Sequence, residues 1–197
     1  MSKRLFDWIL SSLGLLVLGP VLILVALAIK LDSPGPVFFR QERVGRWGHP
    51  FWIHKFRTMR HDPVGRGLQI TVGQDARITR VGGFLRASKI DELPQLIDVW
   101  VGTMSLVGPR PEVPRYVAVY PPELRDKILS VRPGITDIAS IEYRDESAVL
   151  ARAADPEQAY LHEVLPHKLA LSARYVDQAS VWTDLQLILR TLLAIVR

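Results

Sequence analysis

The stretch Ser88-Lys89-Ile90-Asp91-Glu92-Leu93-Pro94-Gln95-Leu96-Ile97 places two adjacent carboxylates at the start of an apolar helical pattern. Apolar residues recur at positions 93, 96, 97 and 100, the spacing of an amphipathic helix. Pro94 limits where this helix can begin, because proline is tolerated in the first turn, where its missing N–H has no partner to lose. We therefore predict that Asp91 is the N-cap and that Glu92 and Leu93 are the first helical residues.

The positive end of such a helix can stabilise two kinds of negative charge. The free N–H groups and the helix dipole favour ionised carboxylates, and they also favour an anionic ligand such as a phosphate. Taken alone, the stretch is better explained as an ordinary capped helix with acidic first-turn residues. The interpretation as a functional site therefore depends on the residues elsewhere in the chain.

Composition sets wide bounds on function. The 197 residues are enough for one sizeable core, and 25 Lys and Arg against 20 Asp and Glu give a net charge of +5. Such an excess fits nucleic acid, a membrane surface or a phosphorylated substrate. The chain has no cysteine, which excludes disulfides and thiolate chemistry.

Residues 8–29 contain no charged side chain and consist mostly of Leu, Val and Ile. As a straight helix this segment would reach about 33 Å, enough to span the apolar core of a bilayer. A cleaved signal peptide is disfavoured, because the apolar run is too long and no small-x-small site follows it. A buried core helix is disfavoured too, since only Ser11 and Ser12 would suit water.

Gly19-Pro20 lies in the middle of this segment and predicts a kink or a break. Basic residues flank both ends, which favours the cytoplasmic side for both: Lys3, Arg4, Lys30, Arg40, Arg43 and Arg46. A re-entrant hairpin of two helices satisfies both observations. A single span remains an alternative, because transmembrane helices tolerate proline. Arg4 and Asp7 lie one turn apart and could pair at the interface.

Residues 37–44 and 51–58 read as two strands of a hairpin. Lys55 and Arg57 would share one face of the second strand, roughly 6–7 Å apart. We expect them to bind a diphosphate or lipid headgroups, or to form a solvated sheet edge. Residues 61–71, rich in Gly, Asp and Pro, are expected to form a loop.

Further cations are predicted to gather near the two carboxylates. A short helix over 77–89 brings Arg80, Arg86 and Lys89 toward them, where they would keep the carboxylates ionised. Arg110 lies between two prolines that hold its backbone extended, which suits a guanidinium for bidentate phosphate binding. Arg132 lies in what reads as a tight turn, Arg132-Pro133-Gly134-Ile135-Thr136. The alternatives are a solvated basic face and a rigid loop with exposed arginines.

The C-terminal third reads as helical. Asp155-Pro156-Glu157-Gln158 has an N-cap, an N1 proline and an N3 glutamine in order, and Pro166 starts a second helix. Residues 182–196 form a strongly apolar helix interrupted by Arg190 and followed by Arg197. It reads as interfacial, with packing in the core as the alternative.

Five motifs occur in the order of one known family. They are Lys3-Arg4-Leu5-Phe6-Asp7, Lys55-Phe56-Arg57-Thr58-Met59, Asp91-Glu92-Leu93-Pro94-Gln95-Leu96, Met104-Ser105-Leu106-Val107-Gly108-Pro109-Arg110-Pro111 and Arg132-Pro133-Gly134-Ile135-Thr136. Over its whole length the chain resembles the bacterial sugar transferases, the small monotopic polyprenol-phosphate phosphoglycosyl transferases.

The resemblance implies the function. Such an enzyme transfers a sugar-1-phosphate from a nucleotide sugar, usually a UDP-sugar, to undecaprenyl phosphate and releases UMP, the first membrane step of glycan assembly. It implies that Asp91 attacks the sugar-bearing phosphate and forms a covalent phosphosugar, that Glu92 assists, and that Mg²⁺ bridges Asp91 and the diphosphate. It also implies a cytosolic domain on the cytoplasmic face of the bacterial inner membrane. A homodimer is left open.

Two departures from the family pattern stand out. The membrane helix carries Gly19-Pro20 where the family often has Ser-Pro, and residues 137–146 replace the usual glycine and glutamine stretch. That segment is expected to contact the sugar or the nucleotide, with Arg144 as a candidate contact, so the sugar is not carried over from the resemblance.

The sequence thus predicts a mostly helical α+β fold. Residues 1–32 would form a re-entrant membrane helix hairpin, and residues 33–197 a cytosolic domain of helices with a short β-hairpin and interfacial amphipathic helices. The competing functions are a glycosyl transferase that releases UDP and a non-catalytic membrane scaffold. Nucleic-acid binding is ranked last, because the aromatic residues fall in apolar patterns rather than among the basic ones.

Overall fold

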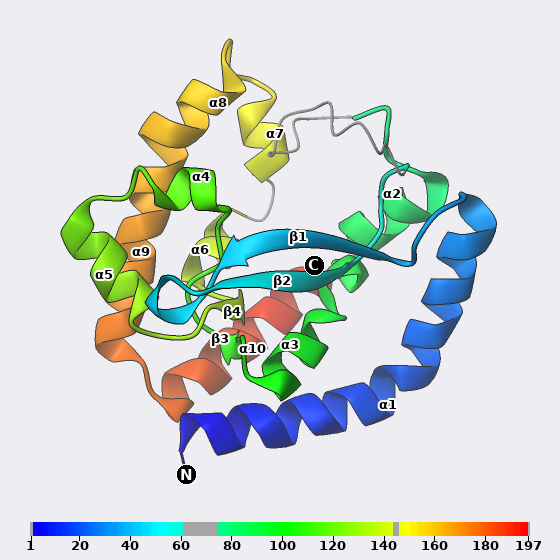
Figure 1. Cartoon of the computed structure of the whole chain (residues 1–197), viewed down its shortest axis with the longest axis horizontal. Coiled ribbons are helices and arrows are strands. Elements are labelled where there is room, and N and C mark those ends of the chain that lie inside the picture. The colour runs from blue at the N-terminus through cyan, green and yellow to red at the C-terminus, as the bar shows by residue number, and fades with distance from the viewer. Residues whose placement is uncertain (1, 61–74, 144–145, 197) are drawn as a thin grey trace.

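A computed structural model of the chain describes residues 2–60, 75–143 and 146–196 (Figure 1). The loop expected at 61–71 and Arg144 lie outside the described residues. The elements run in the order α1 (Lys3–Asp32), β1 (Phe38–Val44), η1 (Arg46–Gly48), β2 (Pro50–Phe56), α2 (Arg80–Ala87), η2 (Ile90–Glu92), α3 (Gln95–Val101), β3 (Ser105–Val107), α4 (Pro114–Val117), α5 (Pro122–Leu129), β4 (Gly134–Thr136), α6 (Ile138–Glu142), α7 (Glu146–Leu150), α8 (Pro156–Ala159), η3 (Tyr160–Val164), α9 (Leu165–Gln178) and α10 (Val181–Val196). The fold is therefore mostly helical with short strands, as predicted.

Helix α1 runs as one helix through Pro20. Figure 1 shows that it changes direction about halfway along its length, which agrees with the expected kink. The predicted break into a hairpin of two helices is wrong, because residues Lys3–Asp32 form one helix with Pro20 inside it. In the part of the chain that the structure describes, α1 is the one helix long and apolar enough to cross a membrane by length and composition.

Both ends of α1 are attached to the rest of the domain. At its start, Lys3 forms an ion pair with Asp184 of α10, and Arg4 donates to the carbonyls of Val99 and Trp100 at 2.5 and 2.8 Å. Asp7 is buried and accepts from the Ser105 hydroxyl at 2.8 Å and the Leu106 amide at 3.1 Å. The expected Arg4–Asp7 pair is therefore wrong, since each residue binds a different distant element.

The predicted hairpin is confirmed. Strands β1 and β2 pair antiparallel, with Phe38 opposite Phe56 at one end and Val44 opposite Pro50 at the other. The inner face of β2 places Phe51 and Ile53 against Val99 of α3 and its neighbour Met104, all buried. This packing fixes β2, and with it Lys55, beside α3.

A second, two-stranded parallel sheet joins β3 to β4, with Ser105 opposite Gly134 and Val107 opposite Thr136. The interpretation of residues 132–136 as only a tight turn was wrong, because these residues pair with a segment nearly thirty residues away. The backbones of Gly108 and Gly134 are so close that a Cβ on Gly134 would lie 2.1 Å from the Gly108 nitrogen. This contact requires glycine, and it positions the loop that carries Arg110.

The start of the helix at the paired carboxylates differs from the prediction. A 3₁₀ turn, Ile90–Glu92, precedes α3, whose N-cap is Pro94 rather than Asp91. The turn begins after Lys89, which has a φ of 58°, the left-handed region. The Asp91 carboxylate binds Lys55 instead of the backbone N–H groups, so a tertiary contact replaces the expected cap.

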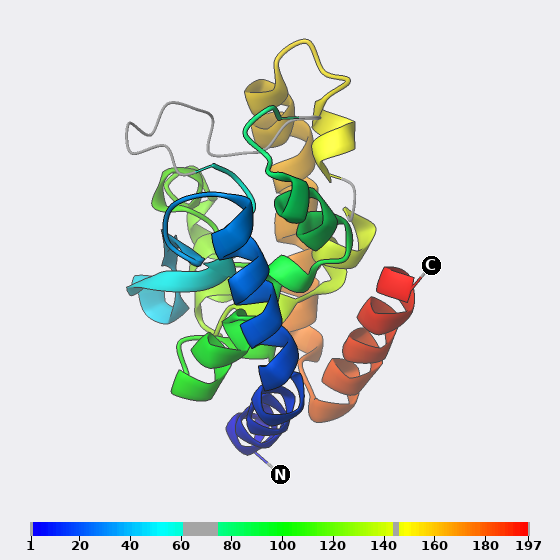
Figure 2. The same cartoon turned by 90° about the vertical axis from the view of Figure 1, so that its right-hand side faces the viewer.

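The C-terminal helices follow the sequence closely. Asp155 caps α8 by accepting from the amides of Glu157 and Gln158, as predicted. Pro166 lies in the first turn of α9. Helix α10 buries Asp184 and Leu187, while five large apolar side chains remain exposed: Trp182, Leu185, Leu189, Leu192 and Leu193. Figure 2 shows α10 lying along one side of the molecule, next to the start of α1.

Candidate functional site

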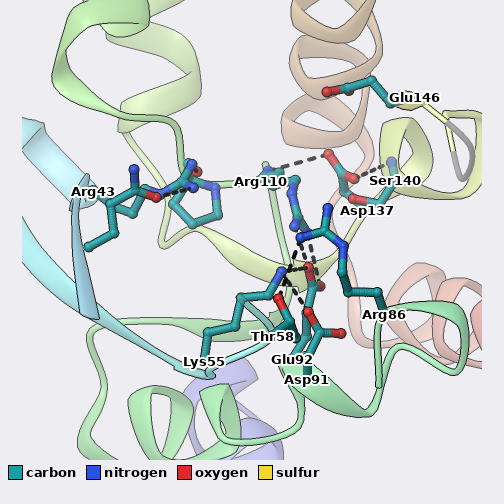
Figure 3. A network of polar contacts seen from close by, with 12 residues as sticks. Arg43, Lys55, Thr58, Arg86, Asp91, Glu92, Arg110, Asp137, Ser140 and Glu146 are labelled. Atoms are coloured by element: carbon teal, nitrogen blue, oxygen red, sulfur yellow. Dashed lines mark hydrogen bonds and ion pairs between the residues drawn. The ribbon is translucent and has the colours of Figure 1, made fainter. Parts of the chain in front are cut away.

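Lys55 links the two adjacent carboxylates. Its Nζ lies 2.8 Å from Oδ2 of Asp91 and 3.2 Å from Oε1 of Glu92 (Figure 3). Strand β2 supplies the lysine and the 3₁₀ turn η2 supplies both carboxylates, so the contact depends on how the hairpin packs against α3. The structure thus brings together three of the residues that the sequence singled out.

Glu92 is held by a second cation, Arg110. Nη1 of Arg110 donates to Oε2 at 3.1 Å and Nη2 donates to Oε1 at 2.5 Å, a bidentate arrangement. Burial alone would raise the pKa of Glu92, but the charges and hydrogen bonds of Arg110 and Lys55 hold that pKa well below its ordinary value. In return, Glu92 raises the pKa of Arg110. Glu92 is therefore ionised, with both of its oxygens occupied.

The Asp91 carboxylate is less fully hydrogen-bonded than that of Glu92. Its exposed fraction is 2%, and Lys55 binds Oδ2, whereas Oδ1 accepts no hydrogen bond from the described residues. A buried carboxylate oxygen without a donor is unusual, since such atoms are nearly always hydrogen-bonded. Of the two carboxylates, Asp91 is the one with a free oxygen for a ligand or a reaction.

Arg86 and Lys89 lie close to this pair. Arg86 donates to the Thr58 hydroxyl at 3.5 Å, and Figure 3 shows its side chain next to the two carboxylates. Desolvation lowers the pKa of Lys89, and the neighbouring charges of Arg110 and Lys55 lower it further. The carboxylates of Asp91 and Glu92 have the opposite effect and raise this pKa. Both residues line the same cavity as Lys55 and Arg110. Four of the predicted cations, Lys55, Arg86, Lys89 and Arg110, therefore meet at one site. Arg80 is exposed on α2 and does not line the cavity.

Two other predicted ligand-binding residues bind backbone carbonyls. Arg57 is buried and donates to the carbonyls of Ile29, Ser33 and Pro34 at the end of α1. Arg57 lines the cavity together with Lys55, but its guanidinium binds the end of α1 and not the two carboxylates. Arg132 donates to the Gly102 carbonyl at 2.8 Å and does not line the cavity. Arg144 lies outside the described residues.

The cavity measures about 1180 Å³ and has two kinds of wall. Its polar wall carries Lys55, Arg86, Lys89 and Arg110 together with Glu92. Its apolar wall comes from α1 and α10 and from the segment after Glu92: Leu10, Leu18, Leu93, Leu96, Ile188 and Leu192. A ligand with an anionic end and a hydrocarbon end would match both walls.

The roles of two residues at the site, Asp137 and Glu112, were missed from the sequence. Asp137 is buried, accepts from the Ser140 amide at 2.7 Å and from the Arg110 amide at 3.4 Å, and so holds the arginine loop. Its position before a short helix, with Ser140 three residues on, is an N-cap pattern that could have revealed it. Glu112 binds distant residues of η3 and α9, which no local pattern indicates.

The residues present fit a hard divalent cation. Oδ1 of Asp91 is a buried carboxylate oxygen that accepts no hydrogen bond from the described residues. Within those residues no cluster of three or more His, Cys, Asp or Glu could hold a metal by itself. Mg²⁺ often binds through one or two carboxylates, with phosphate oxygens and water completing its shell. One buried carboxylate beside cations that could hold a phosphate would meet that requirement.

This fold and site define a class of protein. The family model described as bacterial sugar transferase matches residues 1–197, and the chain belongs to this family. It is 37% identical to UDP-glucose:undecaprenyl-phosphate glucose-1-phosphate transferase of Xanthomonas campestris over 96% of this chain and 38% of that protein.

Two further relatives have the same kind of name. A Caulobacter vibrioides protein with the same name is 38% identical over 97% of this chain and 68% of its own length. The UDP-N-acetylgalactosamine-undecaprenyl-phosphate N-acetylgalactosaminephosphotransferase of Aeromonas hydrophila is 35% identical over 96% of this chain and 42% of that protein. The chain thus spans well under half the length of two of these relatives.

Proposed function

We propose that this chain transfers a sugar-1-phosphate from a UDP-sugar to undecaprenyl phosphate and releases UMP. Membership of the bacterial sugar transferase family and the names of the relatives support the substrate classes. The observation that carries the proposal is the difference in hydrogen bonding between the carboxylates of Asp91 and Glu92. One carboxylate has an oxygen without a hydrogen bond from the described residues, and the other is fully paired with cations.

Asp91 is the nucleophile in this proposal. An oxygen of its carboxylate attacks the sugar-bearing phosphorus, and the bond from that phosphorus to the bridging oxygen breaks, so UMP leaves. An oxygen of undecaprenyl phosphate then attacks the same phosphorus, the bond to Asp91 breaks, and the carboxylate is regenerated. A covalent intermediate divides one difficult exchange between anions into two steps. Because Asp91 is buried, its side chain must turn toward the cavity to react.

In this proposal the cations neutralise the negative charge of the donor's diphosphate. Lys55 already contacts both carboxylates, and Arg110, Arg86 and Lys89 line the cavity where the diphosphate would lie. Glu92 holds Arg110 and Lys55 in place. In phosphoryl transfer, positioned cations of this kind supply most of the rate enhancement. Mg²⁺, held by Asp91 together with phosphate oxygens, would add further charge neutralisation.

The attachments of α1 support a re-entrant position in the membrane. Lys3 and Arg4 at its start contact α10 and α3, and Arg57 binds the carbonyls at its end, so both ends meet one domain. A helix that crossed the bilayer would place its ends on opposite faces, whereas these contacts join both ends of α1 to one domain. Its exposed middle carries large apolar side chains, among them Leu16 and Leu24 at 77% and 66% exposure. Exposed apolar side chains on α10 would lie in the same interface.

The activity is tested with purified protein in nanodiscs, Mg²⁺, a panel of radiolabelled UDP-sugars and undecaprenyl phosphate. Product is expected as UMP and a lipid diphosphosugar, and a quenched reaction without acceptor should yield a phosphosugar adduct on Asp91 by mass spectrometry. Asp91→Asn should abolish both, while Asp126→Asn, at an exposed position on α5, should change neither. Normal turnover by Asp91→Asn would remove Asp91 from this role.

The products also separate the competing functions. Release of UDP in place of UMP would indicate a glycosyl transferase that leaves the phosphate behind. A protein that turns over no UDP-sugar and keeps its cellular role as Asp91→Asn would be a scaffold. Topology is tested with single cysteines at positions 3 and 40, which a membrane-impermeant reagent should label from the same side. Labelling from opposite sides would contradict the re-entrant position.

A further inference from the structure

The cavity has a third region, made of paired acidic and phenolic side chains. Its residues come from the segment after Arg110 and from the C-terminal helices: Glu112, Tyr116, Glu146, Ser147, Tyr160 and Lys168. Figure 3 shows Glu146 on the far side of Arg110 from Asp91 and Glu92. We call these six residues the acidic end of the cavity. The proposed reaction assigns no task to them.

Lys168 organises the acidic end. Its Nζ lies 2.9 Å from Oε2 of Glu146, 3.3 Å from Oε1 of Glu112 and 3.4 Å from the Tyr160 hydroxyl. The Tyr160 hydroxyl donates to the same Glu112 oxygen at 2.7 Å. These contacts occupy the three donors of the ammonium group. They also hold α7, the segment that carries Glu146, against α9.

Glu146 differs from the other acid of this group. Both side chains line the cavity, but Glu112 is 10% exposed and Glu146 is 28% exposed. Lys168 contacts Oε2 of Glu146, which fixes the orientation of the carboxylate. An oriented, partly exposed carboxylate accepts hydrogen bonds from hydroxyl groups and repels phosphates. The phosphates therefore belong at the Lys55–Arg110 side of the cavity, and a hydroxyl-bearing group belongs here.

Tyr116 gives an independent indication of a polar ligand. Its exposed fraction is 2%, and its hydroxyl has no hydrogen-bond partner among the described residues. Its ring lies 4.8 Å from the ring of Tyr160, centroid to centroid, so the side chain is fixed by packing. A buried hydroxyl without a partner is unfavourable, and a ligand hydroxyl at the cavity wall would satisfy it.

We propose that the acidic end binds the hydroxyl groups of the donor's sugar ring, with Glu146 and Tyr116 as specificity-determining residues and Lys168 as the positioning residue for Glu146. This inference rests on the proposed function, because it takes a sugar phosphate as the substrate. A site built to hydrogen-bond a hydroxyl rejects an epimer that lacks a hydroxyl in that direction, since its polar groups are then left unpaired. The acidic end would thus select among UDP-sugars that share the same diphosphate.

The test compares kcat/KM for UDP-glucose and its 4-epimer UDP-galactose in the wild-type protein, Glu146→Gln and Tyr116→Phe. The ratio of the two values does not depend on how much of each preparation is folded. We expect Glu146→Gln to shift the ratio by roughly thirtyfold, the effect of one charge-assisted hydrogen bond. Tyr116→Phe should shift it in the same direction without lowering the thermal unfolding midpoint, since the lost hydroxyl has no partner within the described structure.

Two control variants accompany the comparison. Tyr120→Phe changes another buried tyrosine of the same core that does not line this cavity, and Glu123→Gln changes an exposed carboxylate on α5. Both should keep the wild-type ratio. An unchanged ratio in Glu146→Gln and Tyr116→Phe would overturn the inference.

Two further results are interpretable. If inhibition by UMP weakens in Glu146→Gln while the sugar ratio stays constant, the site binds the ribose, which also overturns the inference. If the wild-type protein releases UMP from no UDP-sugar, it is the proposed function that fails.

Discussion

Arg110 and Glu92 are joined by two parallel hydrogen bonds across eighteen residues of sequence, Nη1 to Oε2 at 3.1 Å and Nη2 to Oε1 at 2.5 Å. Lys55 completes the group by contacting Glu92 and Asp91 together. The pair thus ties the loop after β3 to the turn before α3. It keeps Glu92 ionised and leaves Asp91 as the carboxylate with an oxygen free of hydrogen bonds from the described residues.

Replacing Arg110 by lysine should reduce activity without unfolding the protein. Lysine keeps the charge but cannot form the bidentate contact, and the loss of one charge-assisted hydrogen bond costs about 2 kcal/mol, which is roughly thirtyfold in kcat/KM. UMP release at several donor concentrations measures this. Arg115→Lys is the control, because Arg115 pairs with Glu157 at an exposed position. Wild-type kcat/KM in Arg110→Lys would show that the bidentate geometry is unimportant.

Glu92 should contribute to stability in acid. Its pKa is held below the ordinary value of 4.5, so its contribution is present above pH 4.5 and is lost as the pH falls through the lowered pKa. We expect the thermal unfolding midpoint of the wild-type protein in nanodiscs to fall below pH 4.5 more steeply than that of Glu92→Gln. Parallel curves for the two proteins between pH 7 and 3 would contradict the assigned ionisation.

Arg57 should be structural. Its guanidinium binds three carbonyls at the end of α1, and Arg57→Met would leave these carbonyls without that donor. We expect a loss of about 1–3 kcal/mol in stability, seen as a lower unfolding midpoint and faster proteolysis after residue 32, with an unchanged KM for the UDP-sugar. Arg80→Met on the exposed face of α2 is the control. A raised KM at wild-type stability would restore Arg57 to the substrate site.

Two adjacent glycines in α2 offer a matched pair. A Cβ on Gly82 would lie 2.0 Å from the Thr58 carbonyl oxygen, whereas the nearest atom to a Cβ on Gly83 is 4.0 Å away. Gly82→Ala should therefore force α2 away from Thr58, lowering both the unfolding midpoint and the activity. Gly83→Ala should stabilise the protein by up to about 1 kcal/mol, because alanine favours helix over glycine. Equal effects of the two substitutions would contradict this packing.

Local patterns were enough to predict the hairpin, the Asp155 cap and the bend at Pro20. Alternation, capping residues and proline each act within a few positions, so they can be read from the sequence. The gathering of Lys55, Arg86, Lys89 and Arg110 at the carboxylates was expected from the charge of the motifs, and the structure places them at one cavity.

The parts that failed depend on distant contacts. Asp91 does not cap α3 because Lys55 binds its carboxylate, and the Arg57 guanidinium is engaged by carbonyls at the end of α1. The pairing of β3 with β4 and the burial of Asp7 against β3 join segments roughly thirty and one hundred residues apart. The spacing of residues in the sequence does not indicate such contacts, so they are seen only in the folded structure.

The polar contacts at the two ends of α1 have a mechanical consequence. A helix fastened to its domain by Arg4 and Asp7 at one end and by Arg57 at the other cannot tilt independently of that domain. How deeply the helix sinks into the lipid would then determine how far Lys55 and Asp91 stand above the headgroups. Bilayer thickness would in this way affect the reaction rate. It would change the distance between the site and the phosphate of a lipid acceptor without changing any residue at the site.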